Sequence, residues 1–449
     1  MEAFDPNLYL IIIGILVALS YIFDILSKKL KIPSVLFLLA TGISLQLLYT
    51  HYNSVHISIE RYLPLLGTIG LIMIVLEAAV DLGLSKSKIP MIRQSILLAI
   101  MVLLISSFAI TGIIMYFTNE VFFNSLVYAI PLSVVSSAVL IPSVHTLTQN
   151  KKEFLIYESS FSDIIGIMFF NFIVLQEADI ASFDGIWMIL NTIAYSIVIS
   201  YLLVYFFSKI KTEIKIFLMI SILAILYSLG KQLHFSSLLM IFIFGIVLNN
   251  SNLFFFGRLK KLISPFAIKS IIKDFRIITS ETAFIVRTFF FIAFGMSIDL
   301  ESLIDLKVVG IGSAIVSVLY LVRYMNFKTF LKTDVYPEIF LAPRGLITIL
   351  LFYSIPMENQ LKELGIEVLF FVVLATGLIM MLALLFTKEA KDIGKFTIVD
   401  FGLGPSSDHA NLEEIGTFGE FDDLMESKDE KIDKEVQKHF KKQYKKPNK

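Results

Sequence analysis

The sequence consists mainly of apolar runs of about 20 residues, which short polar segments separate. Such a run is long enough to cross the hydrocarbon core of a bilayer, which is about 30 Å thick. Inside that core the protein itself must satisfy every backbone polar group, so the runs must form helices. Hydrophobic residues make up 56% of the chain, above the roughly 45–50% of soluble domains. The sequence therefore predicts an all-α, polytopic membrane protein.

A hydropathy window of about 20 residues predicts thirteen transmembrane helices. They lie at residues 8–27, 32–49, 62–82, 94–117, 122–148, 154–176, 186–207, 216–230, 235–249, 280–299, 307–325, 335–356 and 366–387. Between the ninth and tenth, the basic and apolar residues of 258–276 predict an amphipathic helix on the membrane surface. Residues 1–390 thus form a membrane domain, and residues 391–449 a charged, partly disordered cytoplasmic tail.

The loops and the ends of these spans carry lysine and arginine unequally. One side of the topology collects 23 of them, including Arg323, and the other side only four. Because cytoplasmic loops are enriched in lysine and arginine, the rich side is the cytoplasm. We expect the N-terminus outside and the C-terminus in the cytoplasm, in the plasma (inner) membrane.

Composition and motifs exclude several classes of function. The formal net charge is zero, which offers no electrostatic basis for binding nucleic acid. The chain has no cysteine, and no cluster of histidines or carboxylates has the spacing of a transition-metal site. There is no phosphate-binding loop and no nucleophile elbow, so neither ATP-driven pumping nor enzyme activity is indicated. We expect no cofactor.

The sixth span places two carboxylates inside an apolar run. Glu158 lies about one turn inside the cytoplasmic end, and Asp163 about nine residues or roughly 14 Å inside, near the midplane. A charge at the bilayer centre costs at least about 2.5–3.5 kcal/mol, so such acids usually serve a function. We hypothesise that a monovalent cation and a proton compete at Asp163. The alternative is a structural ion pair of Asp163 with Arg344 or Arg287.

Prolines interrupt two other spans. The fifth contains Pro131 and Pro142 around Ser136 and Ser137, and the twelfth contains Pro343 beside Arg344. Proline removes a helical hydrogen bond, and exposed backbone at this depth is tolerated only inside protein or along a cavity. Interrupted spans that run in opposite directions indicate the binding site of a secondary transporter. Simple kinks, with serines bonded within their own helices, are the alternative.

Other polar residues receive accessory interpretations. Glu77, near the cytoplasmic end of the third span, is expected to shape an entry funnel. Arg287 in the tenth span either neutralises the site or holds helices together, and Ser159 adds a hydroxyl to the sixth span. Glu158 either lines a cytoplasmic funnel or pairs with Arg344, because an intramembrane arginine needs a counter-charge.

Five stretches resemble, in order, motifs of the sodium/proton exchangers of the monovalent cation:proton antiporter superfamily, with the electroneutral branch most similar. They are Lys31-Ile32-Pro33 with Gly42, Leu76-Glu77-Ala78-Ala79-Val80-Asp81-Leu82, Glu158-Ser159-Ser160-Phe161-Ser162-Asp163, the stretch 289–300, and Ala342-Pro343-Arg344-Gly345. The likeness covers about residues 8–390.

This resemblance implies inverted repeats and a six-helix core with two crossed, unwound helices. It also implies a separate scaffold that forms a homodimer, and an elevator-like movement of the core. Asp163 would bind cation and proton alternately, and Arg344 would pair with Glu158. The chain departs from the family at Ser162, where Asn or Asp is usual, and at Ser136-Ser137-Ala138, where Thr-Asp-Pro is commoner. Sodium is the expected cation, with lithium and potassium open.

The resulting hypothesis is antiport of one cation for one proton. The cation would bind the Asp163 carboxylate, Ser162, Ser136 or Ser137, and backbone carbonyls of the fifth span. A single acid at the site predicts 1:1, electroneutral exchange by alternating access. The alternatives are a gated potassium or proton channel and a transporter-derived sensor that signals through the tail.

Overall fold

The computed structural model describes residues 6–53, 63–84, 88–145, 147–175, 183–209, 216–232, 237–255, 265–298, 301–331, 335–361 and 364–387. Within these ranges the chain forms fifteen α-helices and no β-strand. Each of the thirteen predicted spans contains at least one helix, so the all-α prediction is confirmed. The predicted tail, 391–449, lies outside the described residues.

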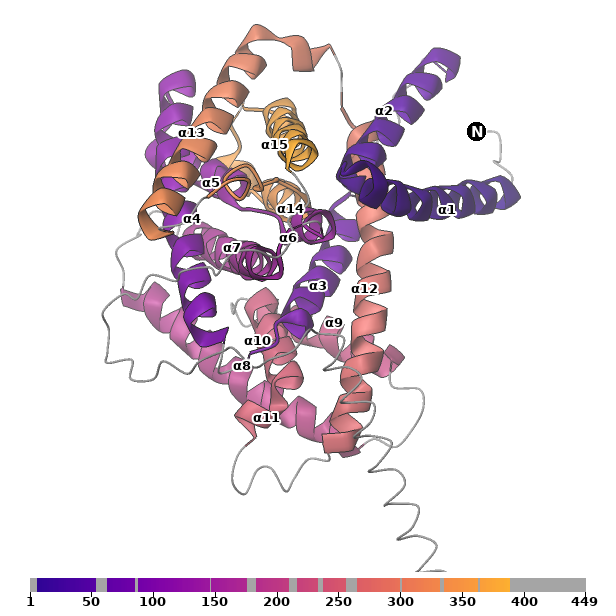
Figure 1. Cartoon of the computed structure of the whole chain (residues 1–449), viewed down its shortest axis with the longest axis vertical. Helices are drawn as coiled ribbons and strands as arrows, with labels where there is room; N and C mark the ends of the chain where they lie inside the picture. The colour runs from indigo at the N-terminus through magenta and orange to yellow at the C-terminus, as the bar shows by residue number, and fades with distance from the viewer. Residues whose placement is uncertain are drawn as a thin grey trace, which may run out of the picture. The chain divides into compact units, whose positions relative to one another are not determined.

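One group of helices packs around the long helix α12, and we call it the scaffold bundle (Figure 1). Its members are α1 (Pro6–Leu30), α2 (Ser34–Asn53), α3 (Leu63–Asp81), α8 (Phe183–Lys209), α9 (Ile216–Gln232), α10 (Ser237–Asn249) and α12 (Pro265–Met296). Helices α2 and α3 lie along α12, and α10 contacts α3, α8 and α9. The bundle thus combines the first three spans with spans from the middle of the chain.

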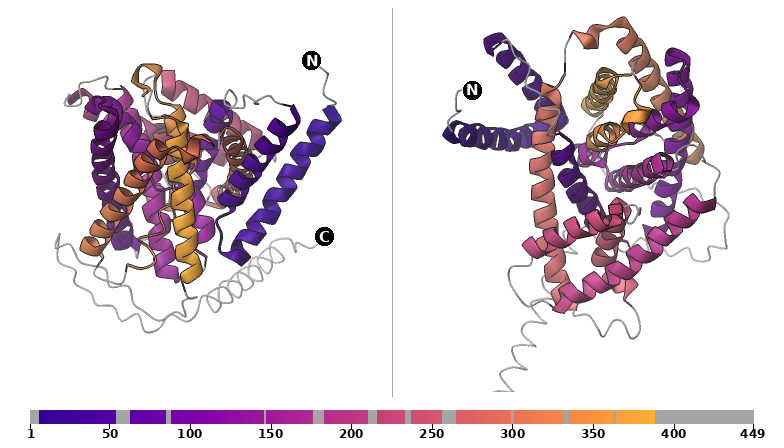
Figure 2. Two further views of the ribbon diagram at one scale, coloured as in Figure 1. Left: turned by 90° about the horizontal axis from the view of Figure 1, so that it is seen from above. Right: turned by 180° about the vertical axis from the view of Figure 1, so that it is seen from behind.

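The helices of the two interrupted spans and their neighbours pack on one another in a second group, and we call it the core bundle. Its members are α4 (Ile89–Thr118), α5 (Phe122–Ser133), α6 (Ser137–Leu140), α7 (Gln149–Leu175), α13 (Leu306–Phe330), α14 (Leu346–Tyr353) and α15 (Ile366–Phe386). Seen from opposite sides, α4, α7 and α15 lie on one side of α12, and α1 and α2 on the other (Figures 1 and 2). Since α5 and α6 belong to one broken span, this is the predicted six-helix core.

Short helical pieces complete the description. They are η3 (Ile141–Ser143), which continues α6, and α11 (Ser251–Phe254), η5 (Ser302–Ile304) and η6 (Met357–Asn359).

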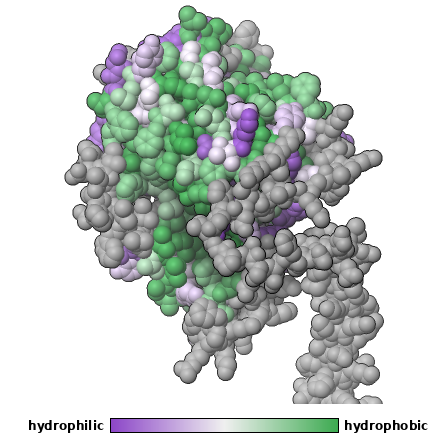
Figure 3. All heavy atoms as spheres, turned by 60° about the vertical axis from the view of Figure 1, so that its left-hand side comes forward, coloured by the Kyte–Doolittle hydropathy of each residue, from purple (hydrophilic) through white to green (hydrophobic). Residues whose placement is uncertain are grey.

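The outer surface of the core bundle is apolar. Large hydrophobic side chains such as Phe108 and Tyr116 on α4, and Leu321 and Met325 on α13, are exposed. Hydrophobic residues make up most of the coloured surface in Figure 3. In a soluble protein such a surface would be a large aggregation-prone patch, whereas lipid solvates it. Five helical segments of the described chain are long and apolar enough to cross a membrane: Ile89–Thr118, Phe122–Ser143, Ile271–Met296, Leu306–Phe330 and Ile366–Phe386.

The prediction of a separate surface helix at 258–276 is wrong for its described part. Residues 265–276 form about the first three turns of α12, which continues without interruption to Met296. No glycine or proline lies between residues 266 and 294 to end the helix. Ile271 and Phe275 are buried, so the packed face of α12 already begins in this segment.

Two glycines bring α2 and α12 into backbone contact. A Cβ atom on Gly42 would collide with the Ile292 carbonyl, and one on Gly295 would lie 2.6 Å from the Leu39 carbonyl oxygen. Helices in lipid gain little hydrophobic energy from association, so small residues that allow close packing are important.

We predict that Gly42→Ala destabilises the protein, because its methyl group must push α2 away from α12 and overpacking costs about 1–3 kcal/mol. Gly112→Ala on the exposed face of α4 is the matched control, since nothing lies within 4 Å of its Cβ position. Alanine favours a helix over glycine by roughly 0.5–1 kcal/mol, so the control should melt at the same or a higher temperature. Thermal melting in detergent measures both variants, and equal melting temperatures would contradict the packing argument.

Candidate functional site

The site lies where two chain breaks meet in the core bundle. Helix α5 ends at Ser133, two residues after Pro131, and the chain is non-helical at 134–136 before α6 begins. The second break, 341–345, precedes α14. The Ser136 backbone N–H donates to the Pro343 carbonyl at 2.9 Å. A Cβ atom on Gly345 would collide with the Ser136 hydroxyl, so only glycine permits this approach. The predicted pair of crossed, unwound helices is therefore present.

The two broken elements run antiparallel. Gly345 lies against Ser136, and further along α14 the Phe352 ring lies 5.2 Å from the Tyr128 ring of α5. The Tyr128 hydroxyl also accepts the Leu361 N–H at 2.9 Å. The chain thus passes the crossing once in each direction, as inverted repeats require.

Asp163 of α7 faces the first break. Its Oδ2 accepts hydrogen bonds from the Ser137 backbone N–H at 2.9 Å and from the Ser137 hydroxyl at 2.5 Å. Its Oδ1 is buried and has no hydrogen-bond partner among the described residues. A buried carboxylate needs a neutralising proton or cation, since an isolated charge is strongly disfavoured there. The arginines considered as structural partners, Arg344 and Arg287, bond to other groups.

The predicted serines divide into different roles. The Ser162 hydroxyl accepts the Val135 N–H at 3.0 Å and so satisfies a backbone group that the break leaves free. The Ser136 hydroxyl is fully buried without a hydrogen-bond partner among the described residues. Ser159 donates to the Ile156 carbonyl of its own helix at 3.3 Å, which does not bring it to the break.

Arg344 stabilises the end of α5. Its guanidinium donates to the Leu132 carbonyl at 2.9 Å and to the Ser133 carbonyl at 3.2 Å, and its backbone N–H donates to Thr376 at 3.1 Å. The last carbonyls of a helix lack intrahelical partners and carry partial negative charge. A buried cation at this position therefore satisfies the broken backbone.

Glu158 pairs with Arg323, and the predicted pair of Glu158 with Arg344 is wrong. Arg323 of α13 forms two parallel hydrogen bonds with the Glu158 carboxylate, at 2.7 and 3.0 Å. It also donates to the carbonyls of Glu338 and Leu341, at 3.2 and 3.3 Å, next to the second break. Both charged side chains are buried, at 1% and 0% exposure.

Arg323 lies within the predicted span 307–325 but was counted with the lysines and arginines of the cytoplasmic side, and the structure shows that its side chain is buried. Helix α13 continues to Phe330 rather than ending at residue 325, so Arg323 lies about two turns inside it. A hydropathy window detects only the apolar part of a helix. It therefore did not include the polar last turn of α13, which extends to Phe330. The position of Arg323 within an apolar run is the sequence feature that could have indicated a buried charge with a buried partner.

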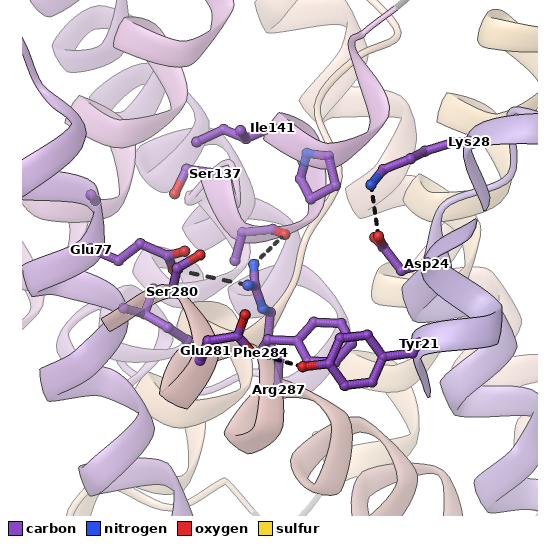
Figure 4. A pocket seen from close by; sticks show the side chains of 14 residues that line it. Tyr21, Asp24, Lys28, Glu77, Ser137, Ile141, Ser280, Glu281, Phe284 and Arg287 are labelled. Atoms are coloured by element: carbon purple, nitrogen blue, oxygen red, sulfur yellow. Dashed lines mark hydrogen bonds and ion pairs between the residues drawn. The ribbon is translucent and has the colours of Figure 1, made fainter. Parts of the chain in front are cut away.

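A cavity of about 390 Å³ lies between the two bundles (Figure 4). Its walls come from α1, α3 and α12 of the scaffold bundle and from α6 and η3 of the core bundle. They comprise Tyr21, Asp24, Lys28, Ile74, Glu77, Ala78, Ser137, Ala138, Ile141, Pro142, Ser280, Glu281, Phe284 and Arg287. Lys28 and Glu281 at the rim are exposed, whereas Ser137 at the inner end is buried. The cavity thus connects the surface to the serine that holds Asp163.

Glu77 and Arg287 both line this cavity. Arg287 donates to the Ala138 carbonyl of the core bundle at 3.0 Å, and its guanidinium lies 3.9 Å from the Glu77 carboxylate. Arg287 therefore connects the scaffold bundle to the first turn of α6.

The transmembrane sodium/hydrogen exchanger profile matches residues 14–387, which is most of the chain and contains the crossing and the cavity. The chain belongs to the sodium/hydrogen exchanger family. This membership confirms the resemblance of its motifs and identifies it as a membrane exchanger of cations and protons. A comparison with curated proteins gave no match.

Two structures of the sodium proton antiporter MjNhaP1 from Methanocaldococcus jannaschii are similar to the exchanger. The structure at pH 8 has 17% sequence identity and a TM-score of 0.63, and the match covers 84% of the exchanger and 95% of the antiporter. The structure from an electron microscopy map has 18% sequence identity and a TM-score of 0.61, and the match covers 85% of the exchanger and 95% of the antiporter. At such low identity the likeness shows the shared antiporter fold, which confirms the predicted fold class.

We predict that Arg323→Met strongly destabilises the exchanger, because it leaves the Glu158 charge buried and unpaired. Breaking a buried pair typically costs about 3–5 kcal/mol. Lys328→Met on the exposed end of the same helix is the control and should change stability little. Melting temperature and resistance to proteolysis in detergent measure the effect. The double variant with Glu158→Gln should recover part of the loss, and no recovery would show that Arg323 acts through other contacts.

Proposed function

We propose that the exchanger transports one monovalent cation, with Na⁺ as the first candidate, in exchange for one proton at Asp163. The observation that carries the proposal is the state of this carboxylate. It is 2% exposed, Ser137 binds one of its oxygens, and the other has no partner among the described residues. A proton or a small cation would satisfy the second oxygen and neutralise the charge.

The ligands proposed for the cation come from the first break, which Asp163 faces, and from the residue before Asp163 on α7. Ser136 and Ser137 in the first break and Ser162 on α7 are hydroxyl groups, and the non-helical residues 134–136 add backbone carbonyls. Oxygen ligands of this kind replace the hydration shell of a hard cation. Lithium and potassium ions also bind oxygen ligands, so they are tested together with sodium.

Coupling follows from the charge on Asp163. A proton or a cation makes the site neutral, whereas the empty carboxylate is a bare charge that resists movement through an apolar environment. Only the loaded core bundle would therefore move, and the two fluxes become linked. Because Arg323 already neutralises Glu158, Asp163 is the one acid of the crossing that we assign to transport. This supports 1:1, electroneutral exchange.

The cavity between the bundles supports alternating access. It reaches Ser137, and its rim carries Lys28, which the positive-inside rule places in the cytoplasm. We propose that the structure is an inward-facing state. Movement of the core bundle against the scaffold bundle would break the hydrogen bond of Arg287 to Ala138 and close this path.

Replacing Asp163 with Asn should abolish exchange, because the amide neither binds a proton nor neutralises a cation. Proteoliposomes with a sodium gradient and an internal pH dye measure the flux. Asp305→Asn is the matched control, since Asp305 is an exposed residue that caps α13, and it should keep full activity. Sodium-driven proton movement by folded Asp163→Asn protein would overturn the assignment.

Exchange should be independent of membrane potential, because one positive charge moves in each direction. A potassium diffusion potential of either sign, imposed on proteoliposomes with valinomycin, should leave the rate of sodium-driven proton flux unchanged. A rate that changes with the sign of the potential would exclude 1:1 stoichiometry. Flux of one ion without the other would indicate a channel.

A further inference from the structure

Thr348 is a buried hydroxyl residue beside the crossing that no motif of the sequence includes. It is the third residue of α14, which follows the second break directly. Its side chain is 0% exposed, and its Oγ1 has no hydrogen-bond partner among the described residues. A buried hydroxyl without a partner is costly and calls for an explanation.

The helix break explains why Thr348 lacks the usual local partner. Hydroxyl groups within helices commonly donate to the carbonyl four residues earlier. Other buried hydroxyls of the core bundle do so, namely Ser107 to Leu103, Thr111 to Ser107, Ser133 to Ala129 and Thr376 to Val372. Four residues before Thr348 stands Arg344, which lies in the non-helical segment. The break therefore leaves this hydroxyl without a carbonyl of its own helix.

The packing of α14 shows which way this hydroxyl faces. Residues three and four apart share one face of a helix, so Thr348 lies on the same face as Gly345 and Phe352. Gly345 lies against Ser136, and Phe352 against Tyr128 of α5. The opposite face, with Leu346 and Leu350, packs on α3 of the scaffold bundle at two glycines, Gly70 and Gly67. Thr348 thus faces the interior of the core bundle, toward the first break.

Three buried oxygens without partners among the described residues therefore come from three elements around the crossing. They are Oδ1 of Asp163 on α7, Oγ of Ser136 in the first break, and Oγ1 of Thr348 on α14. One carboxylate with neutral hydroxyls is suitable chemistry for a monovalent cation. A hydroxyl can also accept the proton of a neutral carboxyl group, so the same set serves both loaded states.

We propose that Thr348 supplies an oxygen ligand to the cation bound at Asp163, and so helps to determine ion selectivity; α14 and α7, which carry these two residues, are in contact. This inference rests on the proposed function of Asp163. Selectivity among hard cations depends on cavity size and on the number and rigidity of the ligands. The start of α14 is held by the Arg344 bonds to α5 and by the contact of Gly345 with Ser136, which makes Thr348 a rigid ligand.

The test compares Thr348→Val, which removes the hydroxyl at nearly constant volume, with Thr348→Ser, which keeps it. Thr111→Val is the matched control, because Thr111 is equally buried but bonded within α4. Half-saturating concentrations of Na⁺, Li⁺ and K⁺ are measured in proteoliposomes. Thr348→Val should raise the value for Na⁺ about tenfold, the typical effect of losing a bond to a charged group. It should also change the ratio of Na⁺ to K⁺, while Thr348→Ser and Thr111→Val stay close to the unchanged protein.

A second measurement separates binding from stability. Cation binding raises the melting temperature of the folded state, so each variant is melted in detergent with increasing Na⁺. Thr348→Val should need more Na⁺ for the same increase. If it melts lower without Na⁺ but keeps the Na⁺ response and the ion ratio, Thr348 is a packing residue and the proposal is wrong. If the unchanged protein exchanges none of the three cations, the function proposed for Asp163 fails instead.

Discussion

The need to satisfy backbone groups inside a bilayer governs this structure. Two helices are broken at membrane depth, and each break would leave N–H and C=O groups without water. Side chains satisfy them: Arg344 binds the carbonyls at the end of α5, Ser162 binds the Val135 N–H, and Asp163 binds the Ser137 N–H. Asp163 and Ser162 thus both stabilise the first break and belong to the proposed ion site.

The other buried charges are each satisfied without Asp163. Glu158 and Arg323 form a closed, two-bond pair that joins α7 to α13, while the charge of Arg344 lies on the carbonyl end of α5, where a cation is favourable. Neither arginine bonds to Asp163. Its carboxylate therefore depends on hydrogen bonds from Ser137 and on a mobile ligand, which is the electrostatic condition for exchange.

Much of this arrangement follows from simple rules of sequence. Hydropathy and bilayer thickness located the thirteen spans, and the depth of Asp163 within its span indicated the midplane, because helical rise is constant. The prolines near Ser136 and Arg344 indicated both breaks, since proline acts on the backbone locally. The partner of Glu158 was not predictable in this way. Arg323 and Arg344 are equally basic, and which one reaches Glu158 depends on where α13 ends and how it packs.

Composition and local backbone chemistry are enough to predict an all-α membrane protein with a buried acid and two interrupted spans. Which side chains contact one another depends instead on how the helices pack in three dimensions. This packing paired Arg323 with Glu158, placed Arg344 on a helix end, and formed the cavity between α1, α3, α6 and α12. It also left the Thr348 hydroxyl facing the crossing without a partner among the described residues. Such contacts join residues that are far apart in the chain. They depend on the rotation and length of each helix, which a local sequence pattern does not predict.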